Sequence, residues 1–170
     1  LFEPITPLPA NYEFGRRTTS LAKGSVFPPA KMALPCDIQW EHDVPVTLRD
    51  GATVYVDVMS PKGSTGRLPA IVSWSPYGKA IPPRVLPSVP PEWVSGLAKL
   101  EGADPAVYVC AGYAIVNPDP RGVGKSSGNM HWWGSVDSYD AYDVIEWIAR
   151  QEWSNGKVAT YGSSWLAMVQ

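Results

Sequence analysis

The chain has 170 residues, of which 45% are hydrophobic and 18% are charged, and its formal net charge is -2. A chain of this size and apolar content can bury one substantial core, which excludes an intrinsically disordered protein. The uncharged stretch at residues 107–116 is much shorter than the roughly 20 apolar residues that cross a bilayer, so no membrane partner is expected. The slightly acidic charge likewise argues against binding to nucleic-acid phosphates.

Proline is the outlier of the composition, because 18 residues in 170 is about twice the usual share of roughly 5%. Residues 1–40 are rich in proline, which removes backbone donors, and they show neither helical nor strand periodicity. We therefore predict a proline-rich N-terminal arm over residues 1–40, packed against a larger surface, and a folded unit over residues 41–170. A second group of prolines, within residues 76–105, predicts shaped loops beside the functional site.

The folded unit is expected to begin with a β-hairpin. Apolar residues alternate on both sides of an Asp50-Gly51 turn, at Val44, Val46, Leu48, Val54, Val56 and Val58. This alternation around an Asp-Gly pair is a strong hairpin signal. Two short apolar runs follow, residues 68–74 and residues 113–117, and they are typical of strands buried on both faces. We expect a helix near residues 93–100 between them.

A second helix is expected over residues 138–150. Its apolar stripe has the spacing of an amphipathic helix and consists of Ala141, Val144, Ile145 and Ile148. Asp140 and Asp143 would then lie on the solvated face of this helix. A strand at residues 157–161 and the start of another helix at residue 165 follow. Strands that alternate with helices in this way predict an α/β fold with a mostly parallel sheet.

The junction between that strand and the last helix holds the strongest chemical signal. Gly162-x-Ser164 at a strand-to-helix turn places the serine in a tight, strained conformation, with its hydroxyl above the sheet edge. The helix start directs free backbone N–H groups to the same place, so the N–H of Trp165 is a candidate donor to an oxyanion. The sequence predicts Ser164 as a nucleophile.

Two other interpretations remain open at this point. The usual motif has glycine two residues after the serine, where this chain has Leu166, so Ser163 or Ser164 could simply cap a helix. Residues 122–126 end in Gly-Lys-Ser like a phosphate-binding loop, but Asp119 stands where that loop needs glycine and no helix follows directly. Nucleotide binding is therefore a remote alternative, and a structural role for Asp119 and Arg121 in a sheet-edge loop is favoured.

Four motifs occur in a fixed order along the chain. They are Arg49-Asp50-Gly51, Ser75-Pro76-Tyr77-Gly78-Lys79, Asp119-x-Arg121-Gly122 and Gly162-x-Ser164-Trp165. In this order they resemble the cocaine-esterase and X-prolyl dipeptidyl-peptidase family of α/β-hydrolases, over roughly residues 40–170. Trp165 and Ala167 depart from the Gly-x-Ser-Tyr-x-Gly form that is common in this family.

The resemblance implies the N-terminal part of an α/β-hydrolase fold, so that residues 41–170 would be the first half of a catalytic domain. It implies a serine hydrolase that cleaves a small ester or amide through an acyl-enzyme. It also implies that the hydroxyl of Tyr77 is the second oxyanion donor, next to the Trp165 N–H. No cofactor is implied, and no Cys, His or carboxylate spacing suggests a metal site.

The general base is the missing element of this interpretation. His42 and His131 both precede Ser164, whereas the order on this fold is Ser, Asp, His. We expect His42 in packing and His131 near the pocket, and we expect the triad Asp and His beyond residue 170. Residues 1–170 alone would then be almost inactive and would need the remainder of the domain, or a second copy, as partner.

The rival interpretation is a non-catalytic binding module with an α/β-hydrolase-like fold. The sequence leaves the substrate's acyl and leaving groups open. Two cysteines, Cys36 and Cys110, are too few for a disulfide framework and look unpaired, which slightly favours a cytoplasmic protein.

Overall fold

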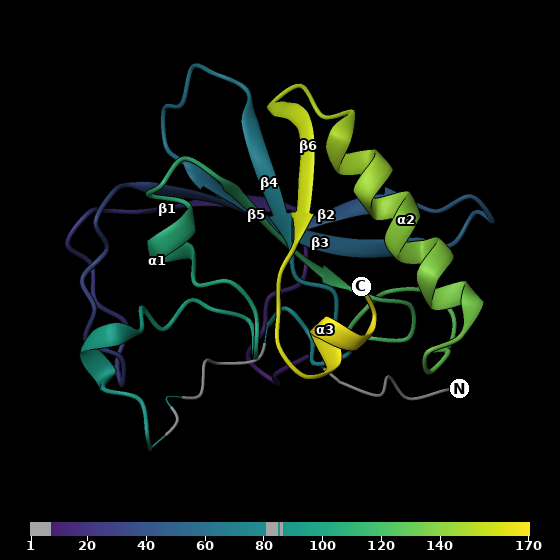
Figure 1. The fold of residues 1–170 in the computed structure, drawn as a ribbon, viewed down its shortest axis with the longest axis horizontal. Helices are drawn as coiled ribbons and strands as arrows, with labels where there is room; N and C mark the ends of the chain where they lie inside the picture. Colours follow the sequence, from purple (N-terminus) through teal and green to yellow (C-terminus); the bar gives the residue numbers. More distant parts are fainter. Residues whose placement is uncertain (1–7, 81–84, 86) are drawn as a thin grey trace.

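The computed structural model describes residues 8–80, 85 and 87–170. Its centre is a six-stranded sheet in the order β1-β2-β3-β5-β4-β6 (Figure 1). The strands are β1 (Arg17–Leu21), β2 (Ile38–Thr47), β3 (Thr53–Pro61), β4 (Leu68–Val72), β5 (Ala114–Asp119) and β6 (Ser154–Thr160). Neighbours from β1 to β5 run antiparallel, whereas β5, β4 and β6 run parallel. The described sheet is therefore mixed, and the expectation of a mostly parallel sheet is wrong for these strands.

The predicted hairpin and buried strands are confirmed. Val46 pairs with Val54 and Val44 with Val56 across β2 and β3. Adjacent residues of the central strands contribute to opposite cores, because successive side chains of a strand point to opposite faces. Val72 belongs to the core that packs against α2 (Ser135–Ala149), and Ile71 belongs to the core that packs against α1 (Pro105–Tyr108). The sheet is thus covered on both faces by this chain (Figure 1).

The helix α2 confirms the predicted amphipathic stripe, since Val144 and Ile148 are fully buried. The expectation that Asp140 and Asp143 lie on a solvated face is wrong for Asp140, whereas Asp143 is only partly buried. Asp140 is only 4% exposed and accepts two hydrogen bonds of 2.8 Å from the guanidinium of Arg121. Asp143 accepts from the guanidinium of Arg49, at 2.6 Å from Nη2. Both carboxylates therefore attach α2 to loops at the ends of strands.

The helix expected near residues 93–100 is absent from the described chain. A single 3-10 turn, Pro91–Trp93, is present instead. Gly96 has a positive φ of 82°, and a Cβ at this position would lie 2.7 Å from the carbonyl oxygen of Phe27. The close approach to the N-terminal segment, together with the left-handed conformation, excludes a regular helix through this position.

The N-terminal region is more regular than its prolines suggest. β1 pairs with β2 from Arg17↔His42 to Leu21↔Ile38, so the expectation of a region without strands is wrong here. Leu34 is 1% exposed and joins the core on the α1 side. The pairing partner of β1 is distant in sequence, and β1 itself is half-buried at the sheet edge, so its local pattern is weak.

Cys36 and Cys110 form a disulfide, which corrects the expectation that they are unpaired. The sequence pattern did not reveal the pairing, because the two cysteines are separated by 74 positions and come together only when the fold places the start of β2 next to the segment after α1. The basis for a cytoplasmic assignment therefore disappears. Within the described ranges, no helix is long and apolar enough to span a membrane.

Candidate functional site

The turn between β6 and α3 (Trp165–Met168) holds Ser164 in a strained backbone conformation. Its φ is 51° and its ψ is -121°, in a region that residues with a side chain rarely adopt. A Cβ at Gly162 would lie 2.1 Å from the Cβ of Leu166, so only glycine fits between strand and helix. Leu166 itself is fully buried and anchors α3. The predicted sharp turn is present, with Ser164 exposed at its tip.

Trp165 is the first residue of α3. A backbone N–H at this position has no acceptor within its own helix, so it is free to face a ligand. The nearby N–H of Leu166 donates to the carbonyl of Ser163 at 3.0 Å, and that of Ala167 donates to the carbonyl of Ser164 at 3.1 Å. The local geometry is that of a helix start beside an exposed hydroxyl, as the sequence predicted.

Tyr77 follows β4 and is partly buried. The side chains of Ser164 and Glu101 both interact with its phenol. Burial raises the pKa of Tyr77, and the nearby charge of Glu101 raises it further, whereas the hydrogen bond with Ser164 lowers it. The phenol therefore keeps its proton at neutral pH and can donate a hydrogen bond. Two of the predicted site residues, Ser164 and Tyr77, come together.

Glu101 is a residue of the site that sequence reasoning missed. It has a positive φ of 62°, and its carbonyl oxygen accepts from the N–H of Ser163 at 3.4 Å. Its Oε2 is buried without a hydrogen-bond partner among the described residues. The only local signal was a Glu-Gly pair in a proline-rich loop, which predicts a turn but no contact with Tyr77.

Aromatic rings surround the elbow on one side. The ring of Trp165 stacks on that of Trp133, with centroids 4.5 Å apart, and meets the edge of Trp132 at 4.8 Å. Trp132 and Trp133 are 56% and 58% exposed in the described chain. Much of each ring is therefore open beside the elbow.

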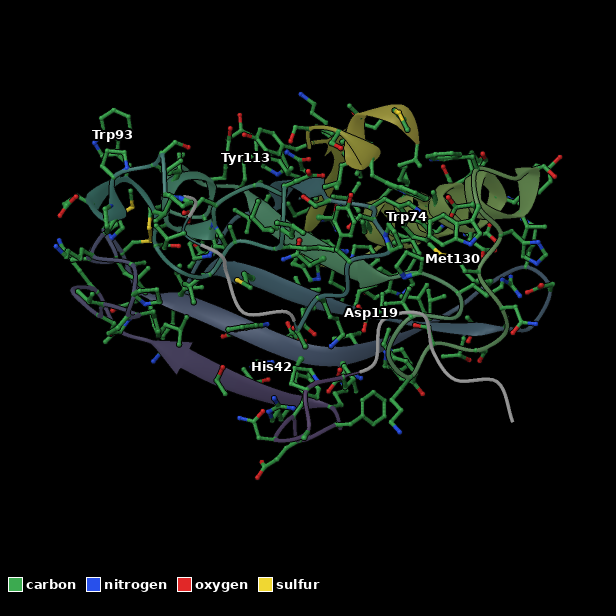
Figure 2. All side chains as sticks on the ribbon, turned by 90° about the horizontal axis from the view of Figure 1, so that it is seen from below. His42, Trp74, Trp93, Tyr113, Asp119 and Met130 are labelled. Atoms are coloured by element: carbon green, nitrogen blue, oxygen red, sulfur yellow. A yellow bond between two sulfur atoms is a disulfide. The ribbon has the colours of Figure 1, made fainter. Side chains whose placement is uncertain are left out.

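Charged side chains are buried behind the turn that carries Tyr77. The ammonium of Lys79 contacts Asp43, lies 2.8 Å from Oδ1 of Asp57 and donates to the Tyr12 hydroxyl at 2.8 Å. Burial alone would lower the pKa of Lys79, but the carboxylates around it raise that pKa above its ordinary value. The Lys79 backbone N–H donates to Oδ1 of Asp119 at 2.6 Å. In the view of Figure 2, Asp119 lies inside the molecule between His42 and Trp74.

The loop at residues 120–134 does not form a phosphate site. Turns follow Gly124, and the next helix begins only at Ser135. A Cβ at Gly124 would lie 2.6 Å from Oδ2 of Asp119, so this carboxylate occupies the interior of the loop. The hydroxyl of Ser126 donates to the carbonyl of Asp119 at 2.7 Å. These contacts support the structural role that the sequence favoured for Asp119.

The histidine expected in packing is found there. His42 is buried on β2, its Nε2 lies 2.8 Å from the Thr19 hydroxyl, and its ring stacks on Trp40. Burial lowers the pKa of His42. His131 is exposed in the loop before α2. Among the residues that the structure places, no group of three or more His, Cys, Asp or Glu side chains could hold a metal ion.

Comparison with known proteins identifies the family of this chain. Residues 50–170 match the X-Pro dipeptidyl-peptidase (S15) family. A Mycobacterium tuberculosis protein that is named as a serine esterase is 34% identical over 134 residues, covering 71% of this chain. Cocaine esterase of Rhodococcus is 30% identical over 130 residues, covering 75% of this chain.

A solved structure is also similar over nearly the whole chain. The CocE/NonD family hydrolase of Staphylococcus aureus superposes with a TM-score of 0.78 at 30% identity, over 99% of this chain and 30% of that protein. The matched part is 20% of each of the two sequence relatives, so this chain spans only a minor part of their length. On this evidence the chain belongs to the X-Pro dipeptidyl-peptidase (S15) family, with CocE/NonD hydrolases among its relatives.

Proposed function

We propose that this chain supplies the nucleophile and the oxyanion-stabilising groups of a serine hydrolase that cleaves a small ester or amide. The observation that carries the proposal is the strained Ser164, whose hydroxyl meets the phenol of Tyr77 at the start of α3. A serine forced into this backbone conformation has a structural cost, which a helix cap alone does not require. The family membership and the esterase names of the relatives support the same chemistry.

In the proposed reaction, Oγ of Ser164 attacks the carbonyl carbon of the substrate and gives its proton to a base. The hydroxyl then no longer bonds to Tyr77. The negative charge that forms on the carbonyl oxygen receives hydrogen bonds from the Trp165 N–H and the Tyr77 hydroxyl. Collapse of this intermediate releases the alcohol or amine, which takes the proton from the base, and water then hydrolyses the acyl-enzyme.

The base and its orienting carboxylate are proposed to come from a histidine and an aspartate beyond residue 170. The relatives are several times longer than the matched region, and the Ser, Asp, His order of this fold places both groups after the nucleophile. The remaining part of the catalytic domain, or a second copy, would then be the partner that completes the site. Residues 1–170 alone would show only the weak activity that oxyanion donors and binding provide.

A fluorophosphonate probe tests the nucleophile directly in the complete enzyme. We expect the probe to label Ser164, and Ser164→Ala to abolish labelling and to lower kcat by about 10⁴-fold or more. Ser163→Ala is the matched control, since it removes the neighbouring exposed hydroxyl and should leave labelling intact. Unchanged turnover in Ser164→Ala would overturn the assignment, and a native protein that neither reacts nor turns over would favour the binding module.

A further inference from the structure

Lys99 is a charged side chain buried deep in the molecule. It is 2% exposed and lies in the loop before α1, outside every motif that the sequence singled out. Its ammonium donates to three backbone carbonyl oxygens: that of Ser73 at 3.2 Å, that of Ser75 at 3.2 Å and that of Pro118 at 2.6 Å. An ammonium has three donors, so the three carbonyls match its full capacity.

These carbonyls belong to the ends of the two central strands. Ser73 and Ser75 directly follow β4 and lead into the turn that carries Tyr77, and Pro118 lies near the end of β5. Three carbonyl oxygens that converge on one point repel each other, and each costs free energy when it is buried without a donor. The Lys99 ammonium therefore stabilises the path of the chain just before Tyr77.

The segment that follows Lys99 holds the same turn at further points. The N–H of Ala103 donates to Oγ of Ser73 at 3.3 Å. The carboxylate of Glu101 interacts with the phenol of Tyr77 itself. The far end of the turn is held by Asp119, which accepts from the N–H of Lys79 at 2.6 Å. The charge of Asp119 also faces Lys99 and compensates part of its burial.

We propose that Lys99 is a positioning residue for Tyr77, which holds the turn between β4 and Lys79 so that the phenol points at Ser164. The inference rests on the proposed role of Tyr77 as an oxyanion donor. Lys99, the three carbonyl-bearing residues and Asp119 are all buried by the described residues themselves, so their contacts do not depend on what covers the exposed surfaces. A misplacement of about 1 Å is enough to cost a catalytic group about 10²-fold in rate.

A double-mutant cycle in the complete enzyme tests the proposal, with kcat and KM for a small ester as the readout. Lys99→Met keeps the aliphatic stem and removes the donors. We expect it to lower kcat by about 10²-fold with little change in KM, because the oxyanion contact forms only in the transition state. In a Tyr77→Phe background, the same change should lower kcat by less than about twofold, since the group that Lys99 positions has already gone.

Lys99→Gln provides the conservative variant, because its amide still donates to one or two of the carbonyls. It should restore part of kcat, and it replaces Lys99→Met in the cycle if the latter does not fold. Equal losses of kcat in both backgrounds would overturn the proposal and make Lys99 a stabiliser of the fold only. A Tyr77→Phe enzyme with unchanged kcat would instead overturn the role of Tyr77, and that result is distinguishable because it needs no change at Lys99.

Discussion

The two sides of the sheet that meet at the candidate site differ in how they hold their residues in place. The closed flank consists of β1, β2, β3 and β5, the segment after β4 that carries Tyr77 and Lys79, and the loop that carries Lys99. It buries charged groups such as Asp43, which is 1% exposed. The open flank consists of β6 and α3, and most side chains along β6 are exposed. Figure 1 shows β6 at the edge of the sheet, with α3 directly beyond its end.

This difference shows that long-range contacts fix the position of Tyr77, whereas contacts between neighbours in sequence fix the position of Ser164. Tyr77 stands on a turn that Lys99 and Asp119 hold through hydrogen bonds between residues distant in sequence. Ser164 stands on a turn whose shape depends on its immediate neighbours, with Gly162 against Leu166. Loss of a buried charge should therefore damage the closed flank most, whereas added volume should damage the open flank.

The largest effect is expected from Lys79→Met on the closed flank. This change leaves the carboxylates of Asp43 and Asp57 buried without their shared cation, which should lower the free energy of unfolding by about 3–5 kcal/mol. Lys62→Met is the control, because it removes an exposed lysine, and it should change the free energy of unfolding by less than about 0.5 kcal/mol. Urea unfolding measures the free energy of unfolding of both variants. If Lys79→Met lost as little as Lys62→Met, the buried charges would not stabilise this flank.

Tyr77→Phe probes the point where the flanks meet. The change removes one hydroxyl and keeps the ring, so the fold should persist while kcat falls by about 10²-fold. Tyr113→Phe, which removes a phenol hydroxyl from an exposed tyrosine before β5, is the control and should retain kcat. Steady-state kinetics of the complete enzyme decide the matter, and an unaltered kcat for Tyr77→Phe would return this tyrosine to a packing role.

Gly162→Ala probes the open flank by volume. The added methyl group would meet Leu166 at a distance that side chains do not tolerate, and overpacking of this kind costs about 1–3 kcal/mol. Gly66→Ala adds the same methyl group where nothing lies within 4 Å, and it should leave the unfolding midpoint in urea nearly unchanged. If both variants unfolded at the same midpoint, the elbow would be more adaptable than its geometry indicates.

Sequence patterns predicted the parts of this molecule that depend on neighbours along the chain. The β2–β3 hairpin, the apolar stripe of α2 and the Ser164 elbow each have a local signature, and all three are present. The motif resemblance located Tyr77, and the structure shows its contact with Ser164. Their catalytic roles remain predictions until the variants are measured.

The features that sequence reasoning missed depend on tertiary contacts. β1 forms because it pairs with a strand distant in sequence. Cys36 forms its disulfide with a cysteine 74 residues away. Lys99 lies where a helix was expected and Glu101 directly after it, and no local pattern there distinguishes a solvated charge from a buried one. The prediction of a solvated Asp140 failed for the same reason, because Arg121 approaches it from another element.

The most gradual effect expected is a pH dependence of stability on the closed flank. Burial lowers the pKa of Lys99 to about 8, although Asp119 opposes this, from an ordinary value of 10.5. Between these two pH values the unfolded chain holds more protons than the folded chain, so the contribution of Lys99 to the free energy of unfolding rises with pH. One group can supply a slope of at most about 1.4 kcal/mol per pH unit.

The measurement is the difference in the free energy of unfolding between the wild type and Lys99→Met, followed by urea unfolding across this pH interval. The difference should grow in favour of the wild type as the pH rises, because Lys99→Met lacks the titrating group while all other groups are shared. Lys157→Met, which changes an exposed side chain of β6, is the matched control on the open flank. A difference that does not vary with pH would show that Lys99 binds its proton equally in both states. Asp119 and the three carbonyls would then solvate the Lys99 ammonium as well as water does. Burial of this charge would have no cost in the free energy of unfolding.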